Sequence, residues 1–339
     1  MPYYVGLDAS KNTTNICVMD AKGAVIREGV VDTDPRAIVR FLRGRGVRYA
    51  AVGMEAWAVS NWLSEGLAEA RLRIVCIETR HAHGVLKARA IKTDRSDARG
   101  IADLIRTGTY RPVHPKSVES RQVRALLAAR QLLASKALSL ENSIRGLLLG
   151  LGLRIAARQR GKFAARVMAL ASKNEFAVGL VRPLLEIRAT LLDEAAKLEK
   201  RLVQLTRTDP VCRLLMSAPG VGPLTSIAFK SAIDDPNRVT DSRAVGALMG
   251  LVPRVRQSGG TERRGRITKT GDRMARSALY LAAMVVLRRG APASWLKSWG
   301  EAVAARRGVK RARIAVARRL SVVLHRMWVT GTPFRPALA

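Results

Sequence analysis

Four acidic side chains hold positions from which they could act together on a metal ion. Acids are scarce in this chain, which has 26 Asp and Glu against 60 Lys and Arg. Asp8 and Glu55 each end a short strand-like run, and Asp94 and Asp97 are three residues apart. Two strands that lie side by side and parallel would bring Asp8 and Glu55 to the same edge of a sheet. On a helix, the three-residue spacing places Asp94 and Asp97 on one face.

Four carboxylates that converge repel one another unless cations lie between them. Hard divalent cations prefer oxygen ligands, and Mg²⁺ is the cation that we expect here. Two such ions about 4 Å apart can polarise a phosphate and stabilise both oxygens of an in-line displacement. Asp103 falls off the face of Asp94 and Asp97 and can instead pair with Arg99 at i, i+4, so we exclude it. The alternative is that Asp94 caps a helix while the two strand-end acids are merely solvated.

A serine followed by two glycines lies in the basic segment RQSGGTERRGRITKTGDRMAR (256–276). The glycines leave the backbone beside Ser258 bare, so that a phosphodiester could reach the hydroxyl. A serine hydroxyl is a weak nucleophile, which a neighbouring base or a metal must activate. The cations that could donate to charge developing on a phosphate are Arg263, Arg264, Arg266 and Lys269. The alternative, which the spacing alone favours, is a flexible basic loop that binds nucleic acid, with Ser258 as a turn residue.

The composition indicates an anionic partner. A formal charge of +34 must be neutralised, and polyphosphate backbones are the usual counterpart. An anionic membrane is the competing partner, but the longest apolar run, 278–287, is far short of the roughly 20 residues that span a bilayer. No signal peptide, zinc-ligand set or P-loop is found, and three scattered cysteines are typical of a reduced cytoplasm. We therefore expect a cytoplasmic, nucleoid-associated protein that binds no membrane.

Residues 1–112 have the pattern of an α/β domain. Three strand-like runs are followed by alternating helix and strand, which is the order of ribonuclease-H-like sheets. Asp34 is the expected N-cap of the first helix. The predicted strands cover 3–9, 14–20, 24–31, 49–55 and 73–78, and the predicted helices cover 35–43 and 58–70.

Residues 113–208 have the pattern of a helical coiled coil. Leucines recur every seven residues from Leu126 to Leu147, and the other seam position is apolar except at Arg130. A second run, from Leu184 to Leu205, repeats the pattern. The two helices could form a hairpin within one chain or pair two subunits. A polar seam residue can fix register and oligomer state, which favours the pairing of subunits.

Residues 209–339 are predicted to be mostly helical and to contact nucleic acid. The turn APGVGPLTS resembles that of a helix-hairpin-helix element, in which Gly220 and Gly222 would let backbone N–H groups approach a phosphate. The basic segment 305–319 could be a solvated helix face or an RNA or DNA contact. Trp295 and Trp299, four residues apart, predict a packed helix face rather than base-stacking residues.

The segments GLDASK, GMEA, KTDRSDA, PGVGPLTS and QSGGTERRGRITKTGD together resemble the DEDD transposases of insertion-sequence family one-hundred-and-ten, which are relatives of the Piv-type DNA invertases. The similarity extends over nearly the whole chain. It implies a RuvC-like domain, a helical coiled coil and a C-terminal transposase domain. It also implies that Mg²⁺ is bound by Asp8, Glu55, Asp94 and Asp97, and that Ser258 forms a covalent phosphoserine with DNA.

The resemblance also implies partners. Family members with this architecture act with a structured noncoding RNA, the bridge RNA, whose loops pair with target and donor DNA. The serine of one subunit would complete the carboxylate site of another, so that a homo-oligomer, a dimer or tetramer, is needed. We therefore expect an RNA-guided, Mg²⁺-dependent DNA transposase or recombinase. Two alternatives stay open: a Holliday-junction-type nuclease that uses water, and a non-catalytic nucleic-acid-binding protein.

Overall fold

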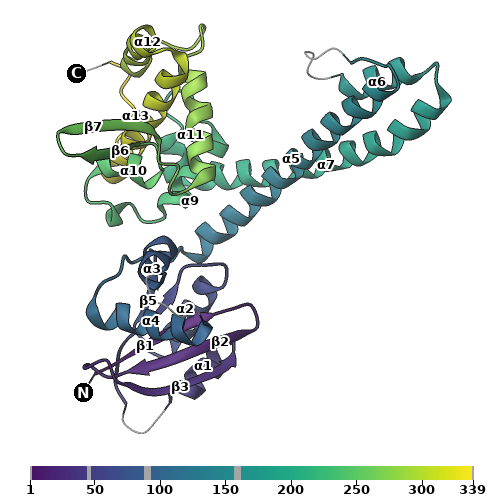
Figure 1. Ribbon diagram of the computed structural model, residues 1–339. Helices are drawn as coiled ribbons and strands as arrows, with labels where there is room; N and C mark the ends of the chain where they lie inside the picture. The colour runs from purple at the N-terminus through teal and green to yellow at the C-terminus, as the bar shows by residue number, and fades with distance from the viewer. Residues whose placement is uncertain (1, 44–46, 88–92, 156–161, 338–339) are drawn as a thin grey trace. The chain divides into compact units, whose positions relative to one another are not determined.

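The computed structural model describes residues 2–43, 47–87, 93–155 and 162–337. It contains two compact units, Met1–Lys116 and Ser117–Ala339. The first is α/β and the second is mostly helical, which confirms the expected fold class at this coarse level (Figure 1). The coiled coil and the helix-hairpin-helix element stay predictions. The expected boundary after residue 112 lies close to the end of the first unit. The helices on both sides of the expected boundary at 208 belong to one unit, so the three-part division stays a prediction.

The first unit is built on a five-stranded sheet with the order β3-β2-β1-β4-β5. β1 pairs with β2, and β2 with β3, in antiparallel orientation, so the first three strands form two consecutive hairpins. β4 pairs in parallel with both β1 and β5, which confirms the neighbourhood on which the carboxylate argument depends. The strands are β1 (Tyr3–Ala9), β2 (Thr13–Met19), β3 (Val25–Asp32), β4 (Tyr49–Glu55) and β5 (Ile74–Ile77).

Helices cover both faces of this sheet. Because side chains alternate along a strand, Leu7 packs with Ile38 and Leu63 on one face, whereas Gly6 faces α4 on the other. Asp34 caps α1, as predicted, by accepting hydrogen bonds from two backbone N–H groups at 2.9 and 3.0 Å. The helices are α1 (Pro35–Leu42), α2 (Ser60–Glu69), α3 (Thr79–Leu86) and α4 (Asp94–Thr107).

A long helical hairpin begins the second unit, with two helices side by side (Figure 1). Ile144 of the first is buried with Val181 of the second, so part of the predicted seam packs within the chain. Other predicted seam residues, Leu147, Ile187 and Leu205, are exposed. Arg130 donates to Glu199 across the hairpin at 2.7 Å. Because the charge of Arg130 is paired inside the chain, this residue gives no support to subunit pairing, which stays a prediction. The helices are α5 (Val118–Gly150), α6 (Phe163–Ala171) and α7 (Glu175–Thr208).

The rest of the second unit is a group of helices with one exposed β-hairpin. Phe229, Leu279 and Leu320 are fully buried in its core, and Trp295 and Trp299 pack against that core as predicted. No helix within the described ranges is long and apolar enough to cross a membrane. The elements are α8 (Pro210–Leu215), α9 (Pro223–Ile233), short 3-10 turns at Pro236–Arg238 and Ser242–Ala244, α10 (Val245–Leu248), β6 (Pro253–Ser258), β7 (Thr261–Ile267), α11 (Arg273–Val286), α12 (Trp295–Arg307) and α13 (Val309–Thr330).

Candidate active site

Two of the predicted carboxylates lie at one edge of the sheet. In the parallel pair β1–β4, Leu7 is opposite Met54, so that Asp8 and Glu55 follow at the same level. Both side chains are half-buried. The strand pairing therefore brings together two acids that are far apart in the sequence.

A close contact between α4 and β1 positions the other two carboxylates. A Cβ atom at Gly6 would lie 2.1 Å from the carbonyl oxygen of Ala98, so only glycine allows the helix to lie this close to the strand. Asp97 immediately precedes Ala98, and Asp94 is one turn earlier. The first turn of α4 is thus held beside the strand that carries Asp8.

The start of α4 is fixed by a capping box. The Thr93 side chain accepts from the Ser96 backbone N–H at 3.1 Å, and the Ser96 hydroxyl accepts from the Thr93 N–H at 3.0 Å. Because Thr93 is the cap, the alternative role of Asp94 as a helix cap is wrong. Both Asp94 and Asp97 lie in the first helical turn, where the helix dipole favours negative charge.

An ion-pair cluster holds the same helix against β3. Arg95 and Arg99 both bind Glu28 at 2.5 Å. The hydrogen bond from Arg99, with that from Arg95, lowers the pKa of Glu28 to about 2. Arg99 is thus ion-paired with Glu28, and Asp103 is ion-paired with Arg106 at 2.6 Å. The predicted Asp103–Arg99 pair is wrong, but the exclusion of Asp103 from the carboxylate group agrees with its ion pair.

The carboxylates lie within one another's electric field. Burial raises the pKa of Asp8 to about 6, and the charges of Asp94, Asp97 and Glu55 add to the rise. Burial, followed by the charge of Asp97, also raises the pKa of Glu55. Among the described residues, the charges that raise the pKa of Asp8 are all acidic. The fold therefore gathers four acids close enough to repel one another.

The donor set fits a hard divalent cation. All donors are carboxylate oxygens, and a cation between them would relieve the repulsion that, after burial, raises the pKa values of Asp8 and Glu55. Within the described part of the chain, however, no group of three or more His, Cys, Asp or Glu side chains is arranged to hold a metal ion. The four acids are therefore near neighbours without a preformed coordination shell.

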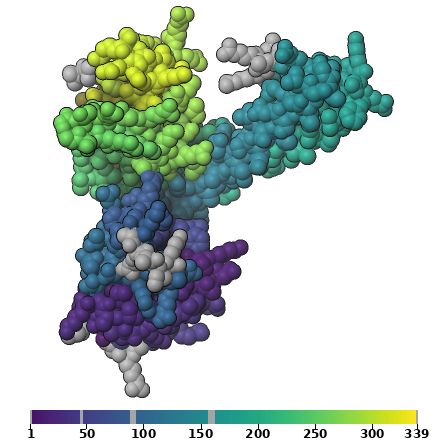
Figure 2. Space-filling model, in the orientation of Figure 1, coloured from purple at the N-terminus to yellow at the C-terminus, as the bar shows by residue number. Residues whose placement is uncertain are grey.

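Ser258 lies at the tip of the β6–β7 hairpin, which Figure 2 shows in green at the surface of the second unit. It pairs with Thr261, so that Gly259 and Gly260 form a two-residue turn. The φ of +56° at Gly259 suits the tight turns that join two strands. The segment is therefore a paired hairpin rather than a loop. The side chain of Ser258 is exposed, and no other atom lies within 4 Å of a Cβ built at either glycine.

The arginines of the hairpin divide between its two faces. Side chains alternate along a strand, and directly opposed residues share a face. Arg256 precedes Ser258 by two residues and is opposed to Arg263, so these three side chains share one face. Arg264 is opposed to Val255 and lies on the other face, and the register shifts before Arg266. Of the predicted arginines, Arg263 accompanies the serine and Arg264 does not. Arg256 was missed, although the alternation in the run RQS points to it.

The two glycines of the turn between α8 and α9 differ. A Cβ at Gly220 would lie 2.5 Å from the carbonyl oxygen of Ala282, and its φ is +75°, so packing against α11 explains this glycine. Gly222 is the N-cap of α9 and has open space around it. A phosphate contact at this turn stays a prediction. Lys269 lies with Arg264 and Arg266 in the lining of a cavity of the second unit.

Both parts of the chain match models of transposase families. Residues 5–153 match a model of the DEDD type from IS110 elements, described as "Transposase". Residues 212–297 match the model described as "Transposase IS116/IS110/IS902 family". The first match contains the four carboxylates, and the second contains Ser258. A DEDD-type domain indicates dependence on a divalent metal, in agreement with the donor set.

Individual transposases are similar over nearly the whole length. The transposase for insertion sequence element IS1111A of Coxiella burnetii is 30% identical over 94% of this chain and 88% of the relative. A probable family 20 transposase of Pseudomonas aeruginosa is 27% identical over 98% of both chains. The transposase for insertion sequence element IS1328 of Yersinia enterocolitica is 23% identical over 84% of both. Because both parts match the family models and the Coxiella burnetii relative is 30% identical over 94% of the chain, the chain belongs to the IS116/IS110/IS902 family of transposases.

Proposed function

We propose that this transposase cuts and rejoins DNA through a covalent phosphoserine at Ser258, with a structured RNA to choose the sites. The observation that carries the proposal is the exposed Ser258 on a hairpin face that also holds Arg256 and Arg263. Directly opposed like charges repel, so this face is suited to an anion such as a phosphodiester. The carboxylates of a RuvC-like first unit supply the other half of the chemistry.

In the proposed step, the Ser258 hydroxyl oxygen forms a bond to the phosphorus, and the bond from phosphorus to one sugar oxygen breaks. The serine loses its proton and the leaving oxygen gains one. Arg256 and Arg263 donate hydrogen bonds to the phosphate oxygens as charge builds up on them. Asp8, Glu55, Asp94 and Asp97 would hold Mg²⁺, which when bound polarises phosphate oxygens. Because the phosphoserine keeps the phosphodiester linkage, a second sugar hydroxyl can displace the serine without ATP.

Guidance by RNA agrees with the charge and composition. The formal charge of +34 suits a protein that binds more than one nucleic-acid strand, and aromatic residues are only 4% of the chain. Such a protein reads backbone and shape, while base pairing between guide and target reads the sequence.

A homo-oligomer would bring the serine of one subunit to the carboxylates of another. The α5–α7 hairpin leaves large apolar side chains uncovered within the single chain, among them Leu132, Leu138 and Ile187, at 56%, 57% and 52% exposure. Burial of apolar surface is the usual driving force of subunit association, so we propose this surface as the subunit contact. Cross-linking of Leu138→Cys, followed by gel analysis, tests it.

The phosphoserine is tested with a nicked suicide substrate and denaturing gels. In Mg²⁺ and cognate RNA, the wild-type protein should give a protein–DNA species, and peptide mapping should place the DNA on Ser258. Ser258→Ala should bind RNA and DNA but give neither adduct nor recombinant. If Ser258→Ala cuts DNA at the wild-type rate, water is the nucleophile and a junction-type nuclease is the better description. If the purified protein recombines DNA without RNA, guidance is refuted.

A further inference from the structure

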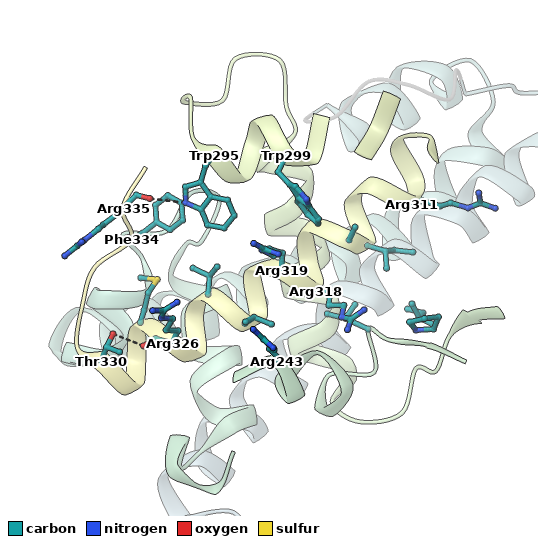
Figure 3. A pocket seen from close by; sticks show the side chains of 18 of the residues that line it. Arg243, Trp295, Trp299, Arg311, Arg318, Arg319, Arg326, Thr330, Phe334 and Arg335 are labelled. Atoms are coloured by element: carbon teal, nitrogen blue, oxygen red, sulfur yellow. Dashed lines mark hydrogen bonds between the residues drawn. The ribbon is translucent and has the colours of Figure 1, made fainter. Parts of the chain in front are cut away.

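The second unit contains a cavity of about 1600 Å³ that the catalytic scheme does not use. α13 lines it along most of its length, β7 contributes Arg264 and Arg266, and α12 contributes Trp295 and Trp299 (Figure 3). The C-terminal segment after α13 adds Phe334. Of its 25 described lining residues, nine are Arg or Lys and none is Asp or Glu. The cavity is therefore strongly positive, and its own lining does not neutralise it.

The charges on α13 share one face of the helix. Arg311, Arg318 and Arg326 are seven and eight residues apart, which is two helical turns each time. Figure 3 shows them with Arg243 around the same space. The described structure assigns none of these four an acidic partner, unlike Arg264, which binds Glu262 at 2.5 Å. Successive α13 arginines are about 10–12 Å apart along the helix axis, so they could contact successive charges of an extended anionic ligand.

The cavity also has an aromatic wall. The rings of Trp295 and Phe334 are stacked with centroids 5.9 Å apart. The guanidinium of Arg319 lies 5.6 Å from the Trp295 ring centroid and 5.5 Å from that of Trp299. The indole N–H of Trp295 donates to the carbonyl oxygen of Arg335 at 3.1 Å, which ties the C-terminal segment to the wall (Figure 3). These contacts hold the rings in place, so that the wall is formed before any ligand binds.

Charge, size and aromatic surface together select the ligand. Small-molecule sites measure roughly 300–1,000 Å³, so this cavity is large for a single metabolite. A duplex presents phosphates at its surface and keeps its bases stacked inside, which leaves an aromatic wall without a partner. An unpaired strand offers both phosphates and exposed base faces, and proteins bind it with cations and aromatic rings together. We propose that the cavity binds an unpaired segment of a nucleic-acid strand, with its phosphates on the α13 arginines and a base against the aromatic wall. Trp295 and Trp299 are only partly buried against the core and also line the cavity, so this adds a base-stacking role that the sequence did not predict.

The cavity lies close to the hairpin that carries Ser258. β7 carries Arg264 in the cavity lining, and Thr261, the partner of Ser258, is three residues away on the same strand, or about 10 Å at 3.4 Å per residue. A strand held in the cavity is therefore held near the hairpin tip. The segment could come from RNA or from a melted DNA strand, because the chemistry is shared. The inference needs only that the protein handles nucleic acid, so it depends neither on RNA guidance nor on a phosphoserine.

The test compares two charge-matched double variants of the full-length protein. Arg318→Gln/Arg326→Gln removes two cavity charges, and Arg306→Gln/Arg307→Gln removes two exposed charges at the end of α12, outside the cavity. Fluorescence anisotropy with short oligouridine RNA, oligothymidine DNA and a mixed-sequence duplex, all in EDTA to prevent cleavage, gives affinity as a function of salt. Circular dichroism confirms that each variant keeps its helices.

Each phosphate contact on a single strand contributes about 0.7 to the slope of log affinity against log salt. The cavity variant should therefore lose about 1.4 of the slope for one or both single strands. Raising the salt from 50 to 200 mM should then weaken its binding about sevenfold less than that of the wild type. The control variant should keep most of the slope. Equal slopes for both double variants would overturn the proposal.

Photo-cross-linking of the wild-type protein tests whether the cavity binds an unpaired strand, even if a variant does not fold. Iodouridine RNA and iododeoxyuridine DNA should attach to the peptides that contain Trp295, Trp299 or Phe334. Whichever oligonucleotide cross-links identifies the source of the strand. Cross-links confined to other peptides, or binding of the duplex with equal loss in the cavity variant, would mean that the cavity holds no unpaired strand.

Discussion

Removal of one site carboxylate should make the metal-free protein more stable while abolishing its activity. Asp8→Asn keeps the shape of the side chain and removes a charge that burial and three neighbouring acids oppose. The pKa of Asp8 rises from 3.8 to about 6, a difference of about two units, and each unit corresponds to 1.36 kcal/mol. Because the side chain is only half-buried, solvent screens part of this, and we expect a gain of about 1–3 kcal/mol at pH 7.5 without metal.

The sign of the pH dependence follows from proton linkage. With the raised pKa, the folded state binds more protons than the unfolded state between pH 3.8 and about 6, so wild-type stability should fall as the pH rises through this window. Above about pH 6 the free-energy cost of keeping Asp8 ionised in the folded state is constant. Below pH 3.8 the wild type and Asp8→Asn should be equally stable. Mg²⁺ at pH 7.5 should stabilise the wild type more than the variant.

Hydrogen exchange followed by mass spectrometry is the suitable assay, because the β1 and β4 amides report on the first unit alone. Protection of these amides is measured from pH 4 to 7.5 after correction for the intrinsic exchange rate, with and without Mg²⁺. Asp103→Asn is the matched control, since Asp103 is paired with Arg106 and its loss should give no gain. If Asp8→Asn is less protected than wild type at pH 7.5 without metal, the carboxylates do not repel as the structure indicates.

Three further predictions concern single residues. Asp97→Asn should lower strand cleavage by at least about 10²-fold with DNA binding retained, whereas Asp103→Asn should be mild; equal losses in a cleavage assay would refute the selection of Asp97. Arg256→Gln should slow formation of the protein–DNA adduct far more than Arg264→Gln, because only Arg256 shares the serine's face; the reverse order in adduct kinetics would exclude this arrangement. Gly220→Ala should destabilise the second unit by more than about 1 kcal/mol in urea unfolding, because of its φ of +75° and the backbone beside it, and an unchanged midpoint would show that the turn adapts.

Local patterns predicted the elements of the first unit well. Strand-like runs broken by polar residues identified the meander, and the Asp34 cap followed from the preference of a short acidic side chain for free N–H groups at a helix start. The heptads of α5 and α7 predicted two long helices, because apolar spacing reports which face of a helix is buried. The same heptads left open whether Arg130 pairs within the chain or between subunits. A seam has the same spacing whether its partner is the same chain or another, and only the folded chain shows Glu199 opposite Arg130.

The sequence by itself determined the chemistry that this protein can carry: acids at the ends of β1 and β4, a D-x-x-D pair on a helix, and a serine before two glycines. These follow from residue type and from contacts within a few residues. Tertiary structure alone decided how they are held. The contact of Gly6 with α4 and the Glu28 cluster join segments some 70 to 90 residues apart, and the two faces of the hairpin depend on its register. Such contacts arise because distant segments bury apolar area and pair charges together, and no local spacing records which segments those are.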